Sequence, residues 1–300
     1  MHPAPTDPSR PTLGIIAGGG AIPVTVAAAA RDSGRPVVVF GIRGEADHAI
    51  QAFPHHWVRW GEIGRLFDLL VREKVGDIVI AGSVSRPDFS AIRVDLGAIL
   101  SLPRILALMV GGDDTVLKGV VRFFEDRGYT IIGAHSVAPD LVATVGQIGR
   151  YGPSASQAVD IGKGFEAARV LGSLDIGQAV VGIGGRVVGV EGVEGTDELI
   201  GRIADLRRRG RLKWSGREGV LVKAAKPQQD LRVDMPTVGP KTVALVADAG
   251  LAGIAVEAGR VMIVDRAATV AAADAARVFL VAETLDMTPA DAPIAPEPAP

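Results

Sequence analysis

The sequence predicts an α/β protein with two domains. Its 300 residues are 48% hydrophobic but only 4% aromatic, and they include 38 glycines, a balance typical of sheets and helices that pack in layers and are joined by tight turns. In the first half, apolar segments of strand length alternate with helical patterns, which indicates a parallel sheet covered on both faces. The sequence contains no cysteine, which excludes a disulfide-stapled secreted module.

The first domain is expected over residues 12–134. An apolar strand over 13–17 is followed by three glycines and a helix-compatible stretch over 22–31. Further strands are expected over 36–40, 77–81 and 129–132, and helices over 62–73, 96–110 and 115–127. Ligands of such sheets collect beyond the carboxyl ends of the strands. The residues expected to share this rim are Gly18–Gly20, Gly41–Arg43, Ser83–Arg86 and Ala134–His135.

A second, less regular α/β domain is expected over residues 156–283, after a Gly- and Pro-containing linker over 135–155. Its short β-rich segments are 178–181, 187–190, 220–223 and 261–264, and its helical patterns are 158–172, 196–209 and 240–249. Four of the 19 prolines lie in residues 1–11 and five lie in the last twelve residues. Both ends, 1–11 and 284–300, are therefore expected to be disordered tails.

The overall charge gives no reason to expect nucleic acid or an anionic membrane as the main partner, because the net charge is −2 and the isoelectric point is about 6.2. No apolar run reaches the roughly 18 residues of a membrane span, and the start does not resemble a signal peptide. We therefore expect a cytoplasmic protein. Residues 202–241 nevertheless carry eleven Lys or Arg against four Asp or Glu, which predicts phosphate attraction in the second domain.

The turn Gly18–Gly20 permits two interpretations. A glycine turn before a helix lets the backbone approach a phosphate or ribose, yet a plain tight turn has the same composition. The spacing Gly-Gly-Gly-x-x-Pro differs from the G-x-G-x-x-G fingerprint of dinucleotide enzymes. No acidic residue closes the second strand at the expected distance. This weakens the hypothesis of a nucleotide-dependent oxidoreductase without excluding nucleotide binding.

Three other groups of polar residues also keep two interpretations each. Asp113 and Asp114 precede a helix, where acids cap free N–H groups, although a ligand or metal role stays open. His135 follows a strand end, a place for a rim histidine or a catalytic one. Glu191 and Glu194 lie in a glycine-broken loop that could hold a hard cation, but Thr196 could equally cap the next helix and leave the acids in solvent.

The densest signal lies between Lys223 and Pro240. In the run Asp230-Leu-Arg232-Val-Asp234, charged and apolar residues alternate, so an extended backbone would place the three charged groups on one face. Such a strip suits Mg²⁺ through carboxylates and a pyrophosphate through Lys and Arg. An edge strand with a solvated ladder of charges explains the alternation too. It does not explain the flanking Lys-Pro and Pro-Thr-x-Gly-Pro, so we favour a functional site.

Taken together, three motifs make the chain resemble a known family. These are the Gly-Gly-Gly turn after Leu-Gly-Ile-Ile-Ala, the helix start Gly-Asp-Asp-Thr, and the run Lys-x-x-Lys-Pro-x-Gln-Asp-x-Arg-x-Asp-x-Pro-x-x-Gly. The chain is similar to the metal-dependent UDP-2,3-diacylglucosamine pyrophosphatases of lipid A biosynthesis, a type common in α-proteobacteria. The resemblance covers about residues 13–281, and its last motif is highly specific.

The resemblance implies Mg²⁺-dependent hydrolysis of UDP-2,3-diacylglucosamine to UMP and 2,3-diacylglucosamine 1-phosphate. It also implies a Rossmann-like first domain, a second domain of unusual fold and a homodimer, with Asp230 as the essential aspartate and Asp234 second. The expected metal ligands are Asp230, Asp234 and Glu191, and the expected catalytic groups are Asp230, Lys223, Lys226 and Arg232. The expected substrate-binding residues are Gly18, Gly19, Gly20, Ser83, Arg86, Asp114, His135, Gln229 and Thr237. The amphiphilic product suggests work next to the inner membrane.

Two rival functions stay open at the level of sequence. One is a nucleotide-dependent oxidoreductase, motivated by a glycine turn in a parallel sheet. The other is a non-catalytic module that binds a nucleotide sugar or a phospholipid. The oxidoreductase predicts quenching of Trp fluorescence or a reduced-nicotinamide signal with NAD(P). The binding module predicts tight binding without metal-dependent loss of the substrate.

Overall fold

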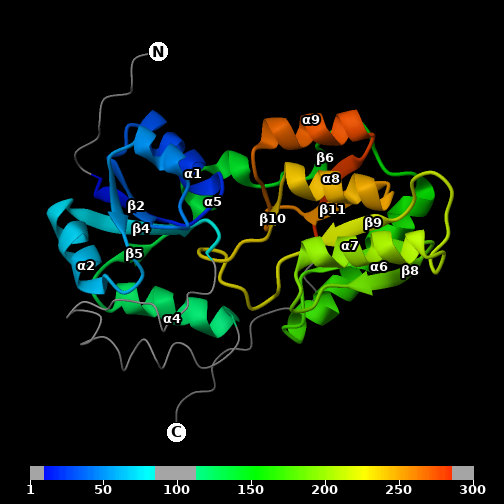
Figure 1. The fold of residues 1–300 in the computed structure, drawn as a ribbon, viewed down its shortest axis with the longest axis horizontal. Coiled ribbons are helices and arrows are strands. Elements are labelled where there is room, and N and C mark those ends of the chain that lie inside the picture. Colours follow the sequence, from blue (N-terminus) through cyan, green and yellow to red (C-terminus); the bar gives the residue numbers. More distant parts are fainter. Residues whose placement is uncertain (1–9, 85–112, 286–300) are drawn as a thin grey trace, which may run out of the picture. The chain divides into compact units, whose positions relative to one another are not determined.

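A computed structural model describes residues 10–84 and 113–285, without the side chains of 113–115. The helix expected over 96–110 and the residue Arg86 lie outside this range, and so does the side chain of Asp114. The chain forms two compact units (Figure 1). Unit 1 runs to Pro139 and also includes Asp230–Asp234, whereas unit 2 comprises Asp140–Gln229 and the chain from Met235 onward.

Unit 1 contains a five-stranded parallel sheet with the order β3-β2-β1-β4-β5. Its strands are β1 (Thr12–Ala17), β2 (Val37–Ile42), β3 (His55–Val58), β4 (Val75–Ala81) and β5 (Thr130–Ile131). Its helices are α1 (Ile22–Asp32), α2 (Ile63–Arg72), α4 (Asp113–Glu125) and α5 (Ala134–Val137), with a 3-10 turn, η1 (His48–Ala52). The chain continues to β2 on one side of β1 and later returns to β4 on the other, so the order of the strands reverses at β1. A crevice for ligands forms at such a switch point.

The predicted parallel sheet of the first domain is confirmed. Ile15 of β1 is fully buried and lies between Val39 of β2 and Val79 of β4 in register. Central strands of parallel sheets are buried on both faces, which explains why β1 and β2 read as continuous apolar runs. Strand β3 was not predicted, because its His-His-Trp-Val sequence has neither an apolar run nor a clear alternation.

Unit 2 contains a six-stranded mixed sheet with the order β6-β13-β11-β9-β7-β8. Its strands are β6 (Gly146–Gln147), β7 (Ala179–Ile183), β8 (Arg186–Val190), β9 (Val220–Lys223), β11 (Gly253–Glu257) and β13 (Phe279–Glu283). A separate parallel pair joins β10 (Thr237–Val238) to β12 (Met262–Ile263). Its helices are α6 (Ala155–Ser173), α7 (Thr196–Arg208), α8 (Pro240–Ala249) and α9 (Arg266–Ala276), with a 3-10 turn, η3 (Pro139–Leu141), at the border of the units.

Two apolar cores sandwich the unit 2 sheet. Leu221 of β9 packs with residues of α7, α8 and α9, while its neighbours Val220 and Val222 pack with α6 residues such as Phe165. Successive strand side chains point to opposite faces, so one short apolar strand supplies both cores. Strands β9, β11 and β13 are parallel. Their carboxyl ends therefore bring Lys223, Glu257 and the segments that follow them to one end of the sheet.

Part of the predicted linker belongs to unit 2. Residues 134–137 form α5, but β6 pairs antiparallel with β13 and extends the unit 2 sheet. The predicted second domain also included residues 230–234, which the structure groups with unit 1. The sequence alone cannot predict that residues 230–234 belong to unit 1, because this depends on where the segment packs.

Candidate active site

In unit 1 the glycine turn and Ser83 lie together at the carboxyl ends of β1 and β4. The Gly19 amide donates to the carbonyl oxygen of Ser83 at 2.7 Å, and the Ser83 amide donates back to Gly19 at 3.0 Å. A Cβ placed on Gly18 would lie 2.3 Å from the Ser83 carbonyl oxygen, so only glycine fits there. Gly20 has φ +89°, a conformation that favours glycine. The expected rim therefore includes both Gly18–Gly20 and Ser83.

His135 lies in α5, shortly after the end of β5, as the sequence predicted. Its Nδ1 atom is buried and has no hydrogen-bond partner among the described residues. Burial lowers the pKa of His135, so the imidazole is neutral at physiological pH. A neutral imidazole has one ring nitrogen that donates a hydrogen bond and one that accepts.

Residues 230–234 form a tight turn, so the predicted extended backbone is wrong. The carbonyl oxygen of Asp230 accepts hydrogen bonds from the amides of Val233 (3.1 Å) and Asp234 (3.0 Å). The Asp230 side chain also accepts from the Arg232 amide at 3.1 Å, the pattern in which an aspartate closes its own turn. This local hydrogen bonding competes with strand pairing and overrides the alternating pattern.

Asp230 and Arg232 form a two-point ion pair inside this turn. Arg232 Nη2 lies 2.7 Å from Asp230 Oδ2, and Nε lies 2.9 Å from Oδ1. Arg232 Nη1 also donates to Glu125 Oε1, at the end of α4, at 2.9 Å. The Arg232 side chain lowers the pKa of Asp230 through these hydrogen bonds, and Lys118 of α4 contributes to the same shift by its charge. Asp230 is therefore an ionised carboxylate at neutral pH.

Val233 anchors the turn in unit 1. It packs against the apolar cluster that includes Phe123 and Phe124 of α4 and Ile131 of β5. In this turn Asp230 and Arg232 form the ion pair, while Val233 joins an apolar core. Asp234 lies in the same turn, is partly buried, and donates its amide to the Asp230 carbonyl.

In unit 2, Lys223 is buried, only 7% exposed, and forms a hydrogen-bonded chain with Thr196 and Glu191. Its Nζ donates to Thr196 Oγ1 at 2.9 Å, and that hydroxyl donates to Glu191 Oε1 at 3.0 Å. Lys223 Nζ also donates to the backbone carbonyl of Thr237 at 3.1 Å. The structure thus joins the predicted Lys223, Glu191 and Thr237, but Thr237 contributes its backbone rather than its hydroxyl.

Thr196 does not cap α7, as one interpretation of the sequence had it. The residue before the helix, Gly195, occupies the cap position, and no side chain caps the helix there. The Thr196 hydroxyl instead relays between a buried lysine and a buried glutamate. Buried charges need such partners, because an isolated ion in a protein interior is strongly destabilised.

The turn after β9 places Lys226 and Gln229 against the loop that follows α6. Lys226 Nζ lies 2.6 Å from Asp175 Oδ1, and Gln229 Nε2 donates to Gln178 Oε1 at 3.4 Å. Gln229 is buried and also accepts the Lys226 amide at 3.0 Å. Gly172 allows this approach, since a Cβ there would lie 3.3 Å from Lys226 Cα. These contacts order the segment that leads to Asp230.

Two of the predicted metal ligands, Asp230 and Asp234, belong to unit 1, and the third, Glu191, belongs to unit 2. Within residues 10–84 and 113–285, no group of three His, Asp or Glu side chains is placed to hold a metal ion. Glu191 accepts the Gln178 amide (3.2 Å) as well as Thr196, which favours a positioning role. Mg²⁺ in phosphoryl-transfer enzymes commonly takes one or two carboxylates and completes its shell with substrate phosphates and water. The ionised Asp230 has the donor chemistry for that mode.

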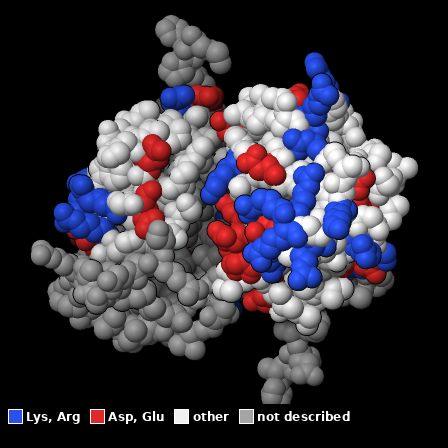
Figure 2. Space-filling model, turned by 45° about the vertical axis from the view of Figure 1, so that its right-hand side comes forward, with Lys and Arg blue, Asp and Glu red and all other residues white. Residues whose placement is uncertain are grey.

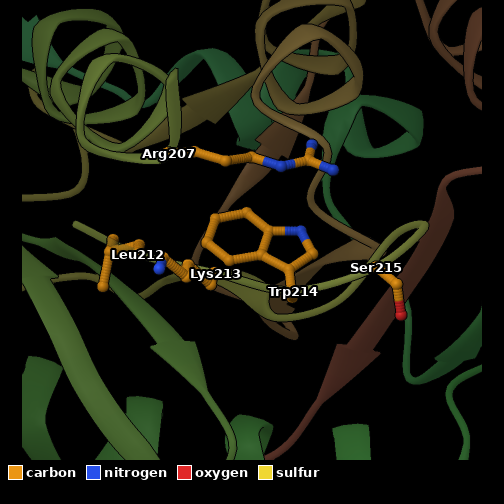
Figure 3. Close-up of a pocket in the computed structure, with 5 residues that line it drawn as sticks. All are labelled: Arg207, Leu212, Lys213, Trp214 and Ser215. Atoms are coloured by element: carbon orange, nitrogen blue, oxygen red, sulfur yellow. The ribbon is translucent and has the colours of Figure 1, made fainter. Parts of the chain in front are cut away.

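The basic cluster upstream of Lys223 is largely structural. Figure 3 shows the Arg207 guanidinium over the Trp214 ring, 4.7 Å from its centre, beside an open pocket also lined by Leu212, Lys213 and Ser215. Arg207 donates to the carbonyl of Ala249 at 3.1 Å, and Trp214 donates to that of Gly250 at 3.0 Å, so both cap the end of α8. Cations at a helix C-terminus complement its dipole.

Charges of both signs cover the face of the molecule shown in Figure 2, where Lys and Arg gather on the right-hand part with Asp and Glu beside them. Arg208 lies 3.3 Å from Asp205, and Arg209 also pairs with Asp205. Part of the positive surplus counted in the sequence is thus neutralised locally.

Several partners of the predicted residues were missed. They are Glu125, Asp175, Gln178, Glu257 and Arg260, and each contacts the run from Lys223 to Arg232 through a side chain. No sequence signal identifies them, since they lie up to 107 positions away along the chain. Thr196, a further partner of Lys223, could have been found from the sequence, because it follows the acidic loop that contains Glu191 and Glu194.

Comparison with known proteins agrees with the motifs. The model of the LpxI N-terminal domain matches residues 12–141, and the model of the LpxI C-terminal domain matches residues 144–281. A curated relative, the UDP-2,3-diacylglucosamine pyrophosphatase LpxI of Caulobacter vibrioides, is 43% identical over 268 residues, which cover 89% of this chain and 96% of the relative. The two family models cover nearly all of the described residues, and this chain therefore belongs to the LpxI family.

Proposed function

We propose that this protein hydrolyses the pyrophosphate bond of UDP-2,3-diacylglucosamine, giving UMP and 2,3-diacylglucosamine 1-phosphate. The observation that carries the proposal is the 43% identity, over nearly the whole chain, to a pyrophosphatase named for that substrate. Water supplies the oxygen that one product gains, and the cleaved bond joins the bridging oxygen to one of the two phosphorus atoms. The structure supports the proposal with a cationic set suited to a pyrophosphate and an ionised carboxylate, Asp230.

Asp230 is the proposed metal-binding and catalytic carboxylate, with Asp234 as its second in the same turn. When bound, Mg²⁺ neutralises phosphate charge and lowers the pKa of a coordinated water. Arg232 already contacts both Asp230 oxygens, so it holds the carboxylate in one orientation and keeps it ionised. A carboxylate fixed before substrate arrives loses less side-chain entropy on binding.

Lys223, Lys226 and Arg232 are the proposed phosphate-binding cations. Lys223 is oriented by Thr196 and Lys226 by Asp175, so each ammonium group has a defined position. Preoriented cations stabilise the charge that develops on phosphate oxygens and the leaving group. Gln229 and Thr237 are proposed to lie near the phosphates, Thr237 acting in part through the carbonyl that holds Lys223.

The nucleotide end of the substrate is assigned to unit 1. The Gly18–Gly20 turn with Ser83 offers backbone groups at the switch point of the sheet, where nucleotides bind in related architectures. His135 adds a buried, neutral imidazole after β5. Arg86 and Asp114 complete the proposed set from the sequence. UMP alone should therefore bind, and titration of the protein with UMP tests this assignment.

The proposal extends to a cytoplasmic homodimer that meets its lipid substrate at the inner membrane. Among the described residues, no helix is long and apolar enough to cross a bilayer. A diacylated substrate has to be drawn from a membrane or micelle surface, which motivates peripheral contact. Sedimentation velocity with and without anionic vesicles tests both the dimer and the contact.

The deciding experiment incubates the protein with UDP-2,3-diacylglucosamine and either Mg²⁺ or a chelator, with UMP detected by mass spectrometry. We expect UMP with Mg²⁺ and a large loss of it with chelator. Tight binding of the substrate without UMP in either condition would favour a binding module. A reduced-nicotinamide signal or tryptophan quenching with micromolar NAD(P) would favour an oxidoreductase.

A further inference from the structure

Glu257 is a buried carboxylate that the proposed chemistry does not use. It ends β11, is 7% exposed, and its pKa is raised by burial. Its Oε2 accepts the Ala225 amide at 2.9 Å, a bond that is itself buried. Burial of a carboxylate costs folding free energy, so a buried carboxylate at this position suggests a specific role for it.

The Ala225 amide lies where the chain leaves the unit 2 sheet. Lys223, the last residue of β9, is opposite Val256, so Glu257 projects just beyond the end of the strand. Where a chain leaves a sheet, its backbone amides lose their partners in the neighbouring strand. Glu257 accepts the hydrogen bond of one such amide, that of Ala225. Ala224 itself donates to the Gln178 carbonyl at 3.0 Å. The exit of the chain is thus held from both neighbouring strands.

Arg260 continues the clamp. Its Nε lies 3.2 Å from Glu257 Oε1, and its Nη2 donates to the Lys226 carbonyl at 3.3 Å. Lys226 then holds Gln229, whose amide donates to the same Lys226 carbonyl at 3.1 Å. Gln229 lies three residues after Lys226 and directly before Asp230. The clamp therefore acts on the base of the segment that carries the catalytic carboxylate.

The same stretch of chain, residues 257–264, also holds the other end of that segment. The Met262 amide donates to the Pro236 carbonyl at 2.8 Å, and β12 pairs with β10 directly after it. The first crossing from unit 1 is held there too, since Gly259 donates to the Ala143 carbonyl at 2.9 Å. All three places where the chain passes between the units are fastened to one short stretch of unit 2.

We infer that Glu257 is a positioning residue for hydrolysis: through Ala225 and through Arg260 and Lys226 it fixes the base of the segment that presents Lys226, Gln229 and Asp230. It does not touch the reacting atoms. A shift of about 1 Å in a catalytic group is enough to slow a reaction on the order of a hundredfold. The inference rests on the proposed function for its kinetic meaning, while the anchoring itself is independent of it.

The test compares Glu257→Ala with Glu257→Gln, which keeps an oxygen to accept the Ala225 amide. For Glu257→Ala we expect kcat for UMP release to fall about tenfold or more with a much smaller change in KM, because groups are displaced and not removed. Glu257→Gln should restore kcat to within about threefold of the wild type. The kcat of Arg260→Ala should lie between those of the two Glu257 variants. Arg260→Ala replaces Glu257→Ala in the test if Glu257→Ala does not fold. Glu283→Ala is the matched control, because Glu283 is exposed and lies opposite Glu257 in register.

A second readout is hydrogen exchange of the peptide that spans residues 224–229. We expect faster exchange there in Glu257→Ala, with the core strands β11 and β13 still protected, and no change in Glu283→Ala. Folded Glu257→Ala with wild-type kcat and unchanged exchange would overturn the inference. An equal loss of protection throughout unit 2 would also overturn it, since Glu257 would then only support the fold. If wild-type protein releases no UMP, the proposed function fails, and the exchange experiment still decides the anchoring.

Discussion

Arg232 and Asp230 lie two residues apart and hold each other face to face, with Nη2–Oδ2 at 2.7 Å and Nε–Oδ1 at 2.9 Å. Bidentate pairs of this kind fix geometry as well as charge. Glu125 holds the far side of the same guanidinium, so one arginine links the proposed catalytic carboxylate to the end of α4. The first three predictions follow from this arrangement.

Replacing Asp230 by Asn keeps the shape of the side chain but removes its charge. We expect UMP release to fall by about two orders of magnitude or more, because a metal ligand and a fixed negative charge are lost together. The melting temperature checks that the fold is retained. Asp205→Asn is a control, since it also removes one acid that pairs with cations, Arg208 and Arg209, and none of these residues belongs to the proposed site. Near-normal turnover of Asp230→Asn with Mg²⁺ would contradict the assignment.

Replacing Arg232 by Gln should shift the acid limb of the pH–rate profile to higher pH. Arg232 is the main cause of the lowered pKa of Asp230, while burial acts to raise it, so the carboxylate of the variant protonates at higher pH. Glu125→Gln retains the Arg232–Asp230 pair and should leave the acid limb nearly in place. The profile of kcat/KM for the three proteins measures the effect. If wild type and Arg232→Gln had the same acid limb, the ionisation that controls the rate at low pH would not be that of Asp230.

The same pair predicts how unit 1 responds to acid. A carboxylate with a lowered pKa stabilises the fold fully above its ordinary value of 3.8, and that contribution is lost as the pH falls through the lowered pKa. We therefore expect the difference in unfolding free energy between wild type and Arg232→Gln to be constant near neutrality and to shrink only in strong acid. Urea unfolding at several pH values measures it. A difference that shrinks already at mildly acidic pH would point to another group.

Replacing Thr196 by Val should both destabilise unit 2 and slow turnover. The variant has nearly the same size but leaves Lys223 Nζ and Glu191 Oε1 without their shared hydroxyl, at a cost of about 1–3 kcal/mol. Thr144→Val, at an exposed threonine of the same unit, is the control and should change stability by less than about 0.5 kcal/mol. Denaturant unfolding and UMP release check the two effects. Wild-type values for both would show that the relay is dispensable.

Replacing Gly18 by Ala should weaken UMP binding and lower stability. The new Cβ would meet the Ser83 carbonyl at 2.3 Å, and because this is backbone the turn has to move, at a cost of about 1–3 kcal/mol. Gly162→Ala, in α6 with no atom near its Cβ position, is the control and should stabilise by about 0.5–1 kcal/mol. Calorimetric titration with UMP and thermal unfolding measure the outcomes. Unchanged UMP affinity in a folded Gly18→Ala protein would remove the glycine turn from the site.

The sequence by itself determined the α/β class, the parallel sheet of the first half and the family. Continuous apolar strands, glycine turns and helical periodicity are local patterns, and the Lys223–Gly239 motif is contiguous. Local patterns can be read without knowledge of what packs against them. They also led to Gly18–Gly20 with Ser83 and to Lys223 with Glu191, pairs that the structure brings together.

Only the tertiary structure decided what the charged run around Asp230 does. Its alternation suits a strand, but hydrogen bonds to the Asp230 carbonyl and the pairing of Val233 with the α4 core make it a turn that belongs to unit 1. The side chains that orient the proposed site, such as Glu125, Thr196 and Glu257, come from distant elements. Their contribution depends on burial and on partners in space, and a one-dimensional pattern carries neither.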